Sequence, residues 1–186
     1  FWVNNQRLMY AGGDYLFAAL DRNGQKHVPM LGGPGPLIHL FRDEKEGWLL
    51  TEGYESLMPE KRAIELPFVL KINARTGITV REMENPGNVT TWFADPQGVI
   101  TAAVERREKS GRTRVIYRAS ETSAWKPLPG LGWDDPSAEP LGFSPNAARL
   151  YLTRVTEGGT WGIYAYDLAQ QALGADFKTG AVIGEG

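Results

Sequence analysis

The chain has 186 residues, of which 42% are hydrophobic and 23% charged, a balance typical of folded globular proteins rather than disordered ones. Its net charge is −2 with both signs interspersed, which argues against a nucleic-acid partner, because such proteins present a dense cationic face. No apolar run is long enough for a transmembrane helix, so no membrane contact is expected, and the lack of cysteine excludes disulfides and thiolate metal sites. The first residue is not a methionine and no leader precedes it, which suggests a fragment or a processed product.

Four ten-residue segments align with one another without gaps. Each opens with Phe, continues with polar turn residues and regains an apolar residue seven places later. They are FWVNNQRLMY at 1–10, FRDEKEGWLL at 41–50, FADPQGVITA at 93–102 and FSPNAARLYL at 143–152. Their spacings of 40, 52 and 50 residues are typical of propeller blades and of helical repeats.

Short β-branched and aromatic runs bounded by Gly, Pro, Asn and Asp favour blades over helices. The first repeat, about 1–31, lacks its opening strand, and its alternating strand at 16–20 precedes the turn 21–24. In the later repeats, about 37–84, 88–129 and 139–178, four strands each are expected, at 37–42, 47–54, 67–73 and 78–83, at 88–94, 99–106, 112–118 and 124–128, and at 140–143, 149–155, 162–167 and weakly at 172–177. A short helix over 168–173 is the alternative in the last repeat.

The repeated Phe is expected to end the innermost strand of each blade and to fill the gap between neighbouring sheets. The Asp or Asn turns are expected to join the two outer strands, with a glycine that accepts positive φ. Together these features predict an all-β fold of β-propeller blades, a partial propeller with about four repeats of four-stranded antiparallel sheets.

Several motifs carry a family resemblance. Phe143-Ser144-Pro145-Asn146, together with segments 149–151 and 163–168, resembles the blade signature of prolyl oligopeptidase and TolB-type propellers. Segments 1–10 and 18–24 resemble an early blade, and 85–90 and 92–95 middle blades, of bacterial dipeptidyl aminopeptidase and acylaminoacyl-peptidase-like enzymes. The resemblance extends over nearly the whole chain.

This resemblance implies that the chain is the propeller of a serine peptidase, which gates the entry of peptides to an α/β-hydrolase domain that this chain lacks. The parent would then be a hydrolase, with a periplasmic or secreted location favoured. The chain departs from the family in having about four blades, where the family's ring has about seven or eight. The exposed end faces of such a partial propeller would favour self-association. Two alternatives stay open: a TolB-type or WD-repeat-like scaffold that binds proteins or ligands without enzymatic activity, and a small propeller closed from these four repeats.

No catalytic, cofactor-binding or metal-binding residue is assigned. Gly142-Phe143-Ser144-Pro145-Asn146 approaches a nucleophile elbow, but Asn replaces the last glycine and Pro145 suits a blade turn. His27 and His39 are expected in blade strands, too few for a zinc site. Asp134-Asp135 with Glu139 lacks the oxygen spacing of a calcium loop.

Four further motifs are expected to be structural. Gly32-Gly33-Pro34-Gly35-Pro36 lacks the lysine of a phosphate loop and is expected to link two blades. Glu82 and Glu84 share one strand face, and Asn88-Val89-Thr90 is a weak glycosylation sequon. The basic residues around Ser110-Gly111 are expected at a solvated hairpin tip; they are Arg106, Arg107, Lys109, Arg112 and Arg114.

Overall fold

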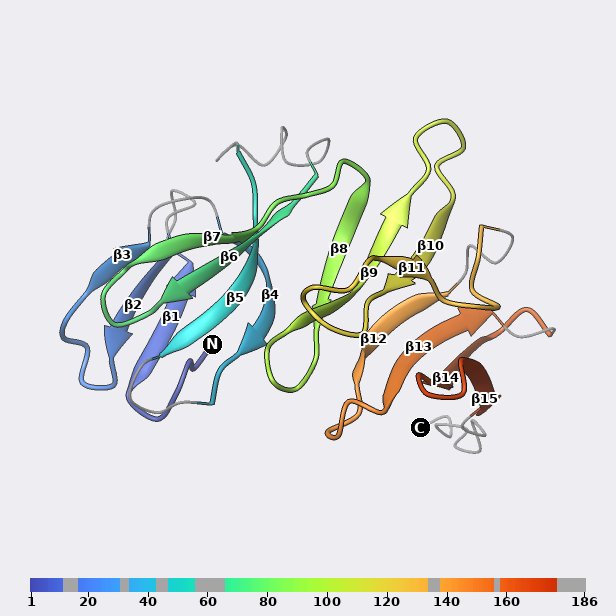
Figure 1. Cartoon of the computed structure of the whole chain (residues 1–186). Coiled ribbons are helices and arrows are strands. Elements are labelled where there is room, and N and C mark those ends of the chain that lie inside the picture. Colours follow the sequence, from blue (N-terminus) through green and yellow to red (C-terminus); the bar gives the residue numbers. More distant parts are fainter. Residues whose placement is uncertain are drawn as a thin grey trace. The chain divides into compact units, whose positions relative to one another are not determined.

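The computed structural model describes residues 1–11, 17–30, 34–42, 47–55, 66–133, 138–155 and 158–176. These residues form fifteen strands in four antiparallel sheets (Figure 1). The predicted all-β class is therefore confirmed, and no helix of the described residues is long and apolar enough to cross a membrane. The chain divides into two compact units, Phe1–Trp92 and Phe93–Gly186, with the boundary inside the strand β8.

The first sheet has three strands in the order β1 (Arg7–Ala11), β2 (Phe17–Asp21) and β3 (Val28–Met30). An opening strand is missing, as the sequence predicts, but the first two residues partly replace it. Phe1 and Met9 exchange backbone hydrogen bonds, and Trp2 forms a bridge with Leu8. The edge of β1 is thus covered by a short extended segment.

The second sheet completes the first unit with strands β4 (Pro34–Leu40), β5 (Trp48–Gly53), β6 (Phe68–Asn73) and β7 (Thr79–Met83). The strand β4 begins three residues before the expected position, inside the proposed link between blades. Its pairing with β5 shifts register on both sides of Leu37, and such irregular edge positions tolerate the two prolines of β4. Gly32 and Gly33 of that link lie outside the described residues.

The second unit contains the other two sheets, apart from the start of β8. The third sheet has β8 (Val89–Ala94), β9 (Ile100–Arg106), β10 (Thr113–Tyr117) and β11 (Lys126–Pro127), and the fourth has β12 (Glu139–Phe143), β13 (Arg149–Val155), β14 (Trp161–Asp167) and β15 (Ala172–Asp176). The strand β11 is shorter than expected because turns continue to Ser123 and Pro127 has no N–H to donate. The alternative helix over 168–173 is wrong, because residues 168–171 form turns that lead into β15.

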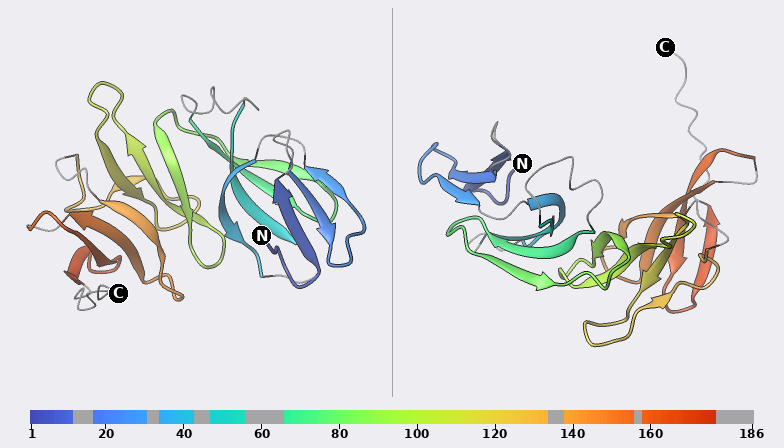
Figure 2. Two further views of the ribbon diagram at one scale, coloured as in Figure 1. Left: turned by 180° about the vertical axis from the view of Figure 1, so that it is seen from behind. Right: turned by 90° about the horizontal axis from the view of Figure 1, so that it is seen from above.

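In every sheet the strands follow one another in chain order, so that each connection is a hairpin (Figure 2). Asx turns close several of these hairpins. Asn73 Oδ1 accepts hydrogen bonds from the N–H groups of Arg75 and Thr76, and Gly77 follows at φ +77°. The turn chemistry expected from the sequence thus forms between the two outer strands.

The repeated Phe does not keep one register. Phe1 pairs with Met9, eight residues later, whereas Phe143 pairs with Leu150, seven residues later. In the second repeat the N–H of Phe41 donates to the carbonyl of Trp48, again seven residues away. The gap-free sequence alignment therefore matches the hairpins only to within one residue, and a shift of one residue exchanges the two faces of a strand.

Among the described residues of each unit, a hydrophobic cluster lies between the two sheets. In the first unit the cluster includes Met9, Ala19 and Met30 of the first sheet and Leu49, Leu70 and Ile72 of the second. In the second unit it includes Ala102, Val115 and Leu128 from the third repeat and Leu150, Leu152 and Tyr166 from the fourth. Burial between facing sheets therefore supplies the main apolar stabilisation inside each unit.

The landmark Phe side chains contribute less than expected. Phe93 and Phe143 are only half-buried, although both pack against the second cluster. Phe41 meets the His39 ring edge-on at 4.9 Å between centroids and lies 5.3 Å from Lys71 Nζ. Phe1 is half exposed. The landmarks mark the hairpins, but the centres of the two clusters are formed mainly by aliphatic side chains.

Candidate binding site

Ser144, the residue of the elbow-like motif, lies in the turn after β12. Its side chain is buried, Oγ accepts a hydrogen bond from the N–H of Arg149 at 3.0 Å and donates one to Asn146 Oδ1 at 2.8 Å. Ala147 in the same turn has φ +57°. These contacts give the hydroxyl a structural task, because it holds the hairpin between β12 and β13 in place.

The two histidines belong to the first unit and occupy different places. His39 lies in β4 as expected and contacts Phe41. His27 is exposed and precedes β3 by one residue, so its expected place inside a strand is wrong. The neighbouring Lys26 has φ +49°, a turn conformation that ends before the strand begins.

The acidic candidates are spread over the surface. Glu82 and Glu84 are exposed, and Glu84 forms an exposed ion pair with Arg81. Glu139 is exposed in β12, whereas Asp134 and Asp135 lie outside the described residues. Within the ranges that the structure describes, no group of three or more His, Cys, Asp or Glu side chains could hold a metal ion.

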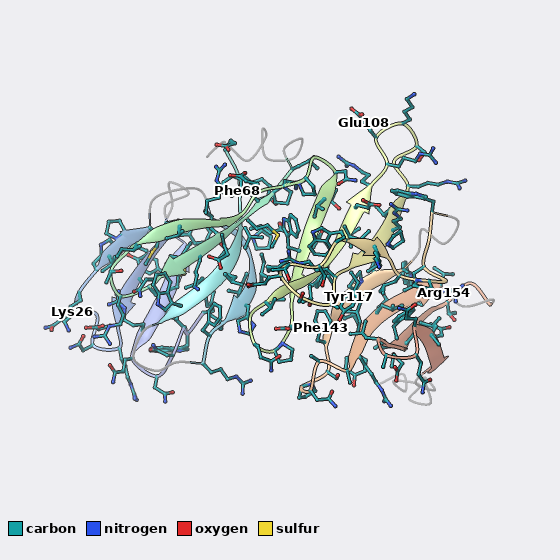
Figure 3. All side chains as sticks on the ribbon, viewed as in Figure 1. Lys26, Phe68, Glu108, Tyr117, Phe143 and Arg154 are labelled. Carbon is teal, nitrogen blue, oxygen red and sulfur yellow. The ribbon has the colours of Figure 1, made fainter. Side chains whose placement is uncertain are left out.

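The basic residues flank the hairpin that joins β9 and β10. Gly111 has φ +66°, and the tip, which carries the labelled Glu108, extends beyond both strands (Figure 3). Arg114 differs from the other basic residues in being partly buried. Its Nε donates to Glu105, and its guanidinium lies 4.4 Å from the Trp133 ring centroid. The remaining four cations are exposed, as expected for a solvated hairpin.

A first buried charge is Arg7 of the first unit, and each nitrogen of its guanidinium donates a hydrogen bond. Its Nε and Nη2 donate to the carbonyl of Ala74 at 3.1 and 2.6 Å, and Nη1 donates to Asp21 and to the carbonyl of Lys26 at 2.8 and 2.9 Å. The hydrogen bond from Arg7 holds the pKa of Asp21 below its ordinary value. Arg7 therefore ties the first sheet to the turn after β6.

A second buried charge, Glu52 of β5, has neutral partners. Its Oε2 accepts a hydrogen bond from the Tyr54 hydroxyl at 2.8 Å, and Oε1 accepts one from the backbone N–H of Trp92 at 3.2 Å. The Trp92 indole donates to the carbonyl of Pro67 at 2.8 Å. Burial raises the pKa of Glu52, and its hydrogen bonds offset only part of this effect. These contacts all lie inside the first unit and connect β8 to the second sheet.

A third buried charge, Arg118, directly follows β10 in the second unit. Only 8% of the residue is exposed. Its Nε donates a hydrogen bond to the carbonyl of Ile100 at 2.7 Å, and its Nη1 donates one to the carbonyl of Glu121 at 2.7 Å. Its guanidinium carbon lies 4.8 Å from the Trp125 ring centroid. Burial lowers the pKa of Arg118, and the charge of Glu121 opposes this shift. Both partner oxygens are neutral carbonyls.

A cavity of about 550 Å³ opens beside Arg118 within the second unit. One wall comes from the end of β10 and from β11, and the other from the turn after β14. Its polar lining residues include Tyr117, Arg118, Ser123, Lys126 and Gln171. Leu128 and Leu168 are among its apolar ones. The volume lies in the range of small-molecule pockets, and none of its lining residues is acidic.

Comparisons with known proteins define the fold. No protein-family model matches the sequence, and no curated protein matches it. Among solved structures, TolB from Acinetobacter baumannii superposes with a TM-score of 0.56 at 16% sequence identity over 90% of this chain. The chain has a β-propeller fold. It spans 40% of the TolB chain, so the four sheets are blades of a partial propeller.

The blade arrangement shows which buried charges the sequence did not reveal. In the first, second and fourth blades, the strands β2, β6 and β14 end with Asp21, Asn73 and Asp167, each at the start of a turn. At the corresponding end of β10, the third blade has Arg118. This exchange of a turn residue for a cation was the available signal for Arg118. Glu52 carried a weaker one, a charged residue in a strand that is otherwise apolar.

Proposed function

We propose that this chain is a non-catalytic part of a β-propeller that serves as a binding scaffold. The match of its fold to TolB across 90% of the chain is the observation that carries the proposal. The structural task of the Ser144 hydroxyl, which braces a blade turn, is in keeping with it. The purified chain should leave prolyl and acyl-amino peptide substrates intact. Hydrolysis that disappears in Ser144→Ala would contradict the proposal, whereas hydrolysis that persists would point to a contaminant.

The scaffold is proposed to associate through the outer face of the fourth blade. This face includes Leu141, Trp161 and Ile163, which are 54%, 57% and 43% exposed. A shallow hollow of about 530 Å³ lies over it, lined in part by Leu141, Tyr151 and Ile163. An apolar face of this kind favours association, since its burial removes apolar surface from water.

The occupant that we propose is the first blade of a second copy. Each unit already packs two neighbouring blades against each other through an apolar cluster. The side of the first blade that faces away from its cluster carries Leu8 and Tyr10, and the bridging Trp2 is 52% exposed. Both faces carry apolar side chains, as the packed faces inside each unit do. Copies would thus extend the contact that the blades already make.

Light scattering tests this association. The chain should have about twice its monomer mass of 20.6 kDa, and Ile163→Lys should return it to the monomer mass. Val80→Lys, at an exposed apolar position of β7, is the matched control and should leave the mass unchanged. A mass of 20.6 kDa at every concentration would overturn the association through this face.

A second candidate function is the gating part of a prolyl oligopeptidase-family serine peptidase. The observation in its favour is the blade signature at 143–146 and 163–168. In this case the partner would be an α/β-hydrolase domain and the gated molecules would be peptides, in a periplasmic or secreted parent. A Gly-x-Ser-x-Gly elbow encoded in the same reading frame after Gly186 would favour the gate over the scaffold.

A further inference from the structure

The guanidinium groups of the two buried arginines, Arg7 and Arg118, have different hydrogen-bond partners. Arg7 donates to a carboxylate and to two carbonyls, so every nitrogen of its guanidinium has a partner. Arg118 donates through Nε and Nη1 to two carbonyls, and its Nη2 has no hydrogen-bond partner among the described residues. This Nη2 is not one of the buried polar atoms that lack a partner, so it still reaches solvent. Its N–H groups can therefore donate to a molecule that enters from outside.

The charge of Arg118 is also unmatched by an ion pair. No carboxylate of the described residues forms a salt bridge with it, although the exposed Glu121 is close enough to affect its pKa. The cavity adds the exposed Lys126 and lacks any acidic lining residue. Two cationic side chains therefore face a space whose lining supplies no carboxylate, so an anion that enters the cavity could pair with them.

The walls of the cavity limit the kind of anion. Pro127, Leu128 and Leu168 supply apolar surface next to the cations, while Tyr117 and Ser123 supply hydroxyl groups. A small inorganic anion would leave the apolar walls without contacts. An organic carboxylate would contact both the cations and the apolar walls of the cavity. Its carboxylate would accept hydrogen bonds from Arg118 and Lys126, and its apolar body would cover the leucines.

We infer that the cavity beside Arg118 binds an organic carboxylate with an apolar side group, of the kind presented by the C-terminal residue of a peptide or by a small aromatic acid. The cavity volume of about 550 Å³ suits a ligand of one or two residues. The cation–π contact with Trp125 and the two carbonyl hydrogen bonds restrain the guanidinium of Arg118. The site deepens the proposed binding function and rests on it only in that the ligand is held and not converted.

The test is titration of the isotopically labelled full chain, followed by NMR, with four probes. They are acetyl-Leu-Phe with a free carboxylate, the same peptide as its C-terminal amide, 3-phenylpropanoate and inorganic phosphate. The free acids should shift the Nε–H signal of Arg118 and the indole N–H signal of Trp125. The amide and phosphate should bind at least about tenfold more weakly, because a charge-assisted hydrogen bond or the apolar contact is lost. The tighter of the two acids identifies the source of the carboxylate.

Variants with little risk of unfolding locate the site. Lys126→Ala removes an exposed cation of the cavity and should weaken binding up to about fivefold. Lys109→Ala removes an exposed cation from the hairpin tip of the same unit and should leave the affinity unchanged. Ala124→Phe fills the cavity from an exposed lining position and should abolish binding.

The site would be overturned by equal affinity for the amide, by equal affinity for phosphate, or by an equal effect of Lys126→Ala and Lys109→Ala on the affinity. The same spectra separate this failure from that of the proposed function. Release of free phenylalanine from acetyl-Leu-Phe would overturn the non-catalytic scaffold. Absence of any shift at Arg118 and Trp125, with the peptide intact, would overturn the carboxylate site alone.

Discussion

The two units solve the same problem, a buried arginine beside a blade hairpin, in two ways. In the first unit, Arg7 has the carboxylate of Asp21 at 2.8 Å, and the hollow that Arg7 lines has a volume of about 120 Å³. In the second unit, Arg118 has neutral carbonyl partners and a cavity of about 550 Å³. The difference teaches that a neutralised buried charge braces the fold, whereas one without a counterion beside open space is suited to a ligand.

The largest expected effect comes from removing each arginine in turn. Arg7→Met should lower the free energy of unfolding of the first unit by about 3 kcal/mol, because a buried carbonyl, a partly buried carbonyl and a carboxylate lose their donor. Arg118→Met should cost the second unit about 1–2 kcal/mol, since only two carbonyls are affected. Amide hydrogen exchange resolves the two units separately. Equal costs for both variants would break the comparison.

Substitution of a landmark Phe in each unit compares how tightly these rings are packed in the two units. Phe143→Ala should cost about 2 kcal/mol, less than the 3–5 kcal/mol of a fully buried Phe, because the ring is half-buried against the second cluster. Phe41→Ala should cost about 1 kcal/mol, as its ring contacts mainly His39 and Lys71. Denaturant midpoints measure both. A Phe143→Ala midpoint equal to that of wild type would show that the hairpin register is wrong.

Two carboxyl groups of the first unit should respond to pH in opposite directions. The pKa of Glu52 is raised by burial, so the folded state holds its proton more tightly and stability falls as pH rises above the ordinary value of 4.5 through the folded pKa. The pKa of Asp21 is lowered by Arg7, so stability falls as pH drops below 3.8.

Unfolding midpoints measured against pH distinguish these groups. Glu52→Gln should remove the loss above pH 4.5, while the exposed control Glu55→Gln should retain it. Arg7→Met should weaken the loss below pH 3.8. An unchanged profile in Glu52→Gln would show that its carboxyl ionises as freely in the folded chain as in the unfolded one.

The smallest expected effect concerns the aromatic support of Arg118. Trp125→Leu should cost about 0.5–1 kcal/mol, the usual contribution of a cation–π contact that is partly exposed. It should also speed the exchange of the Arg118 Nε–H with water. Trp133→Leu is the matched control, because its arginine, Arg114, keeps an ion pair with Glu105. Similar Nε–H exchange rates for Arg118 in both variants would exclude a positioning role for Trp125.

Local patterns explain why most strands could be predicted. Alternation in 149–155 and the Asx turn at Asn73 depend on neighbouring residues alone, and both appear in the structure as expected. The early start of β4 at Pro34 escaped prediction, because a proline-rich segment joins a sheet only where a partner strand accepts register shifts. The one-residue difference between the Phe hairpins escaped prediction for the same reason, since register is set by the pairing of two strands.

By itself, the sequence determined the all-β class, the order of the hairpins and the turn chemistry, because each depends on residues within a few positions of one another. Only the tertiary structure decided which charges are buried, as Arg7 meets Ala74 across 67 residues and Glu52 meets Trp92 across 40. The cavity beside Arg118 likewise needs β10, β11 and the turn after β14 in one place. Burial and counterion matching are properties of surfaces brought together by packing, so a local pattern can point to a residue such as Arg118 but cannot fix its partners.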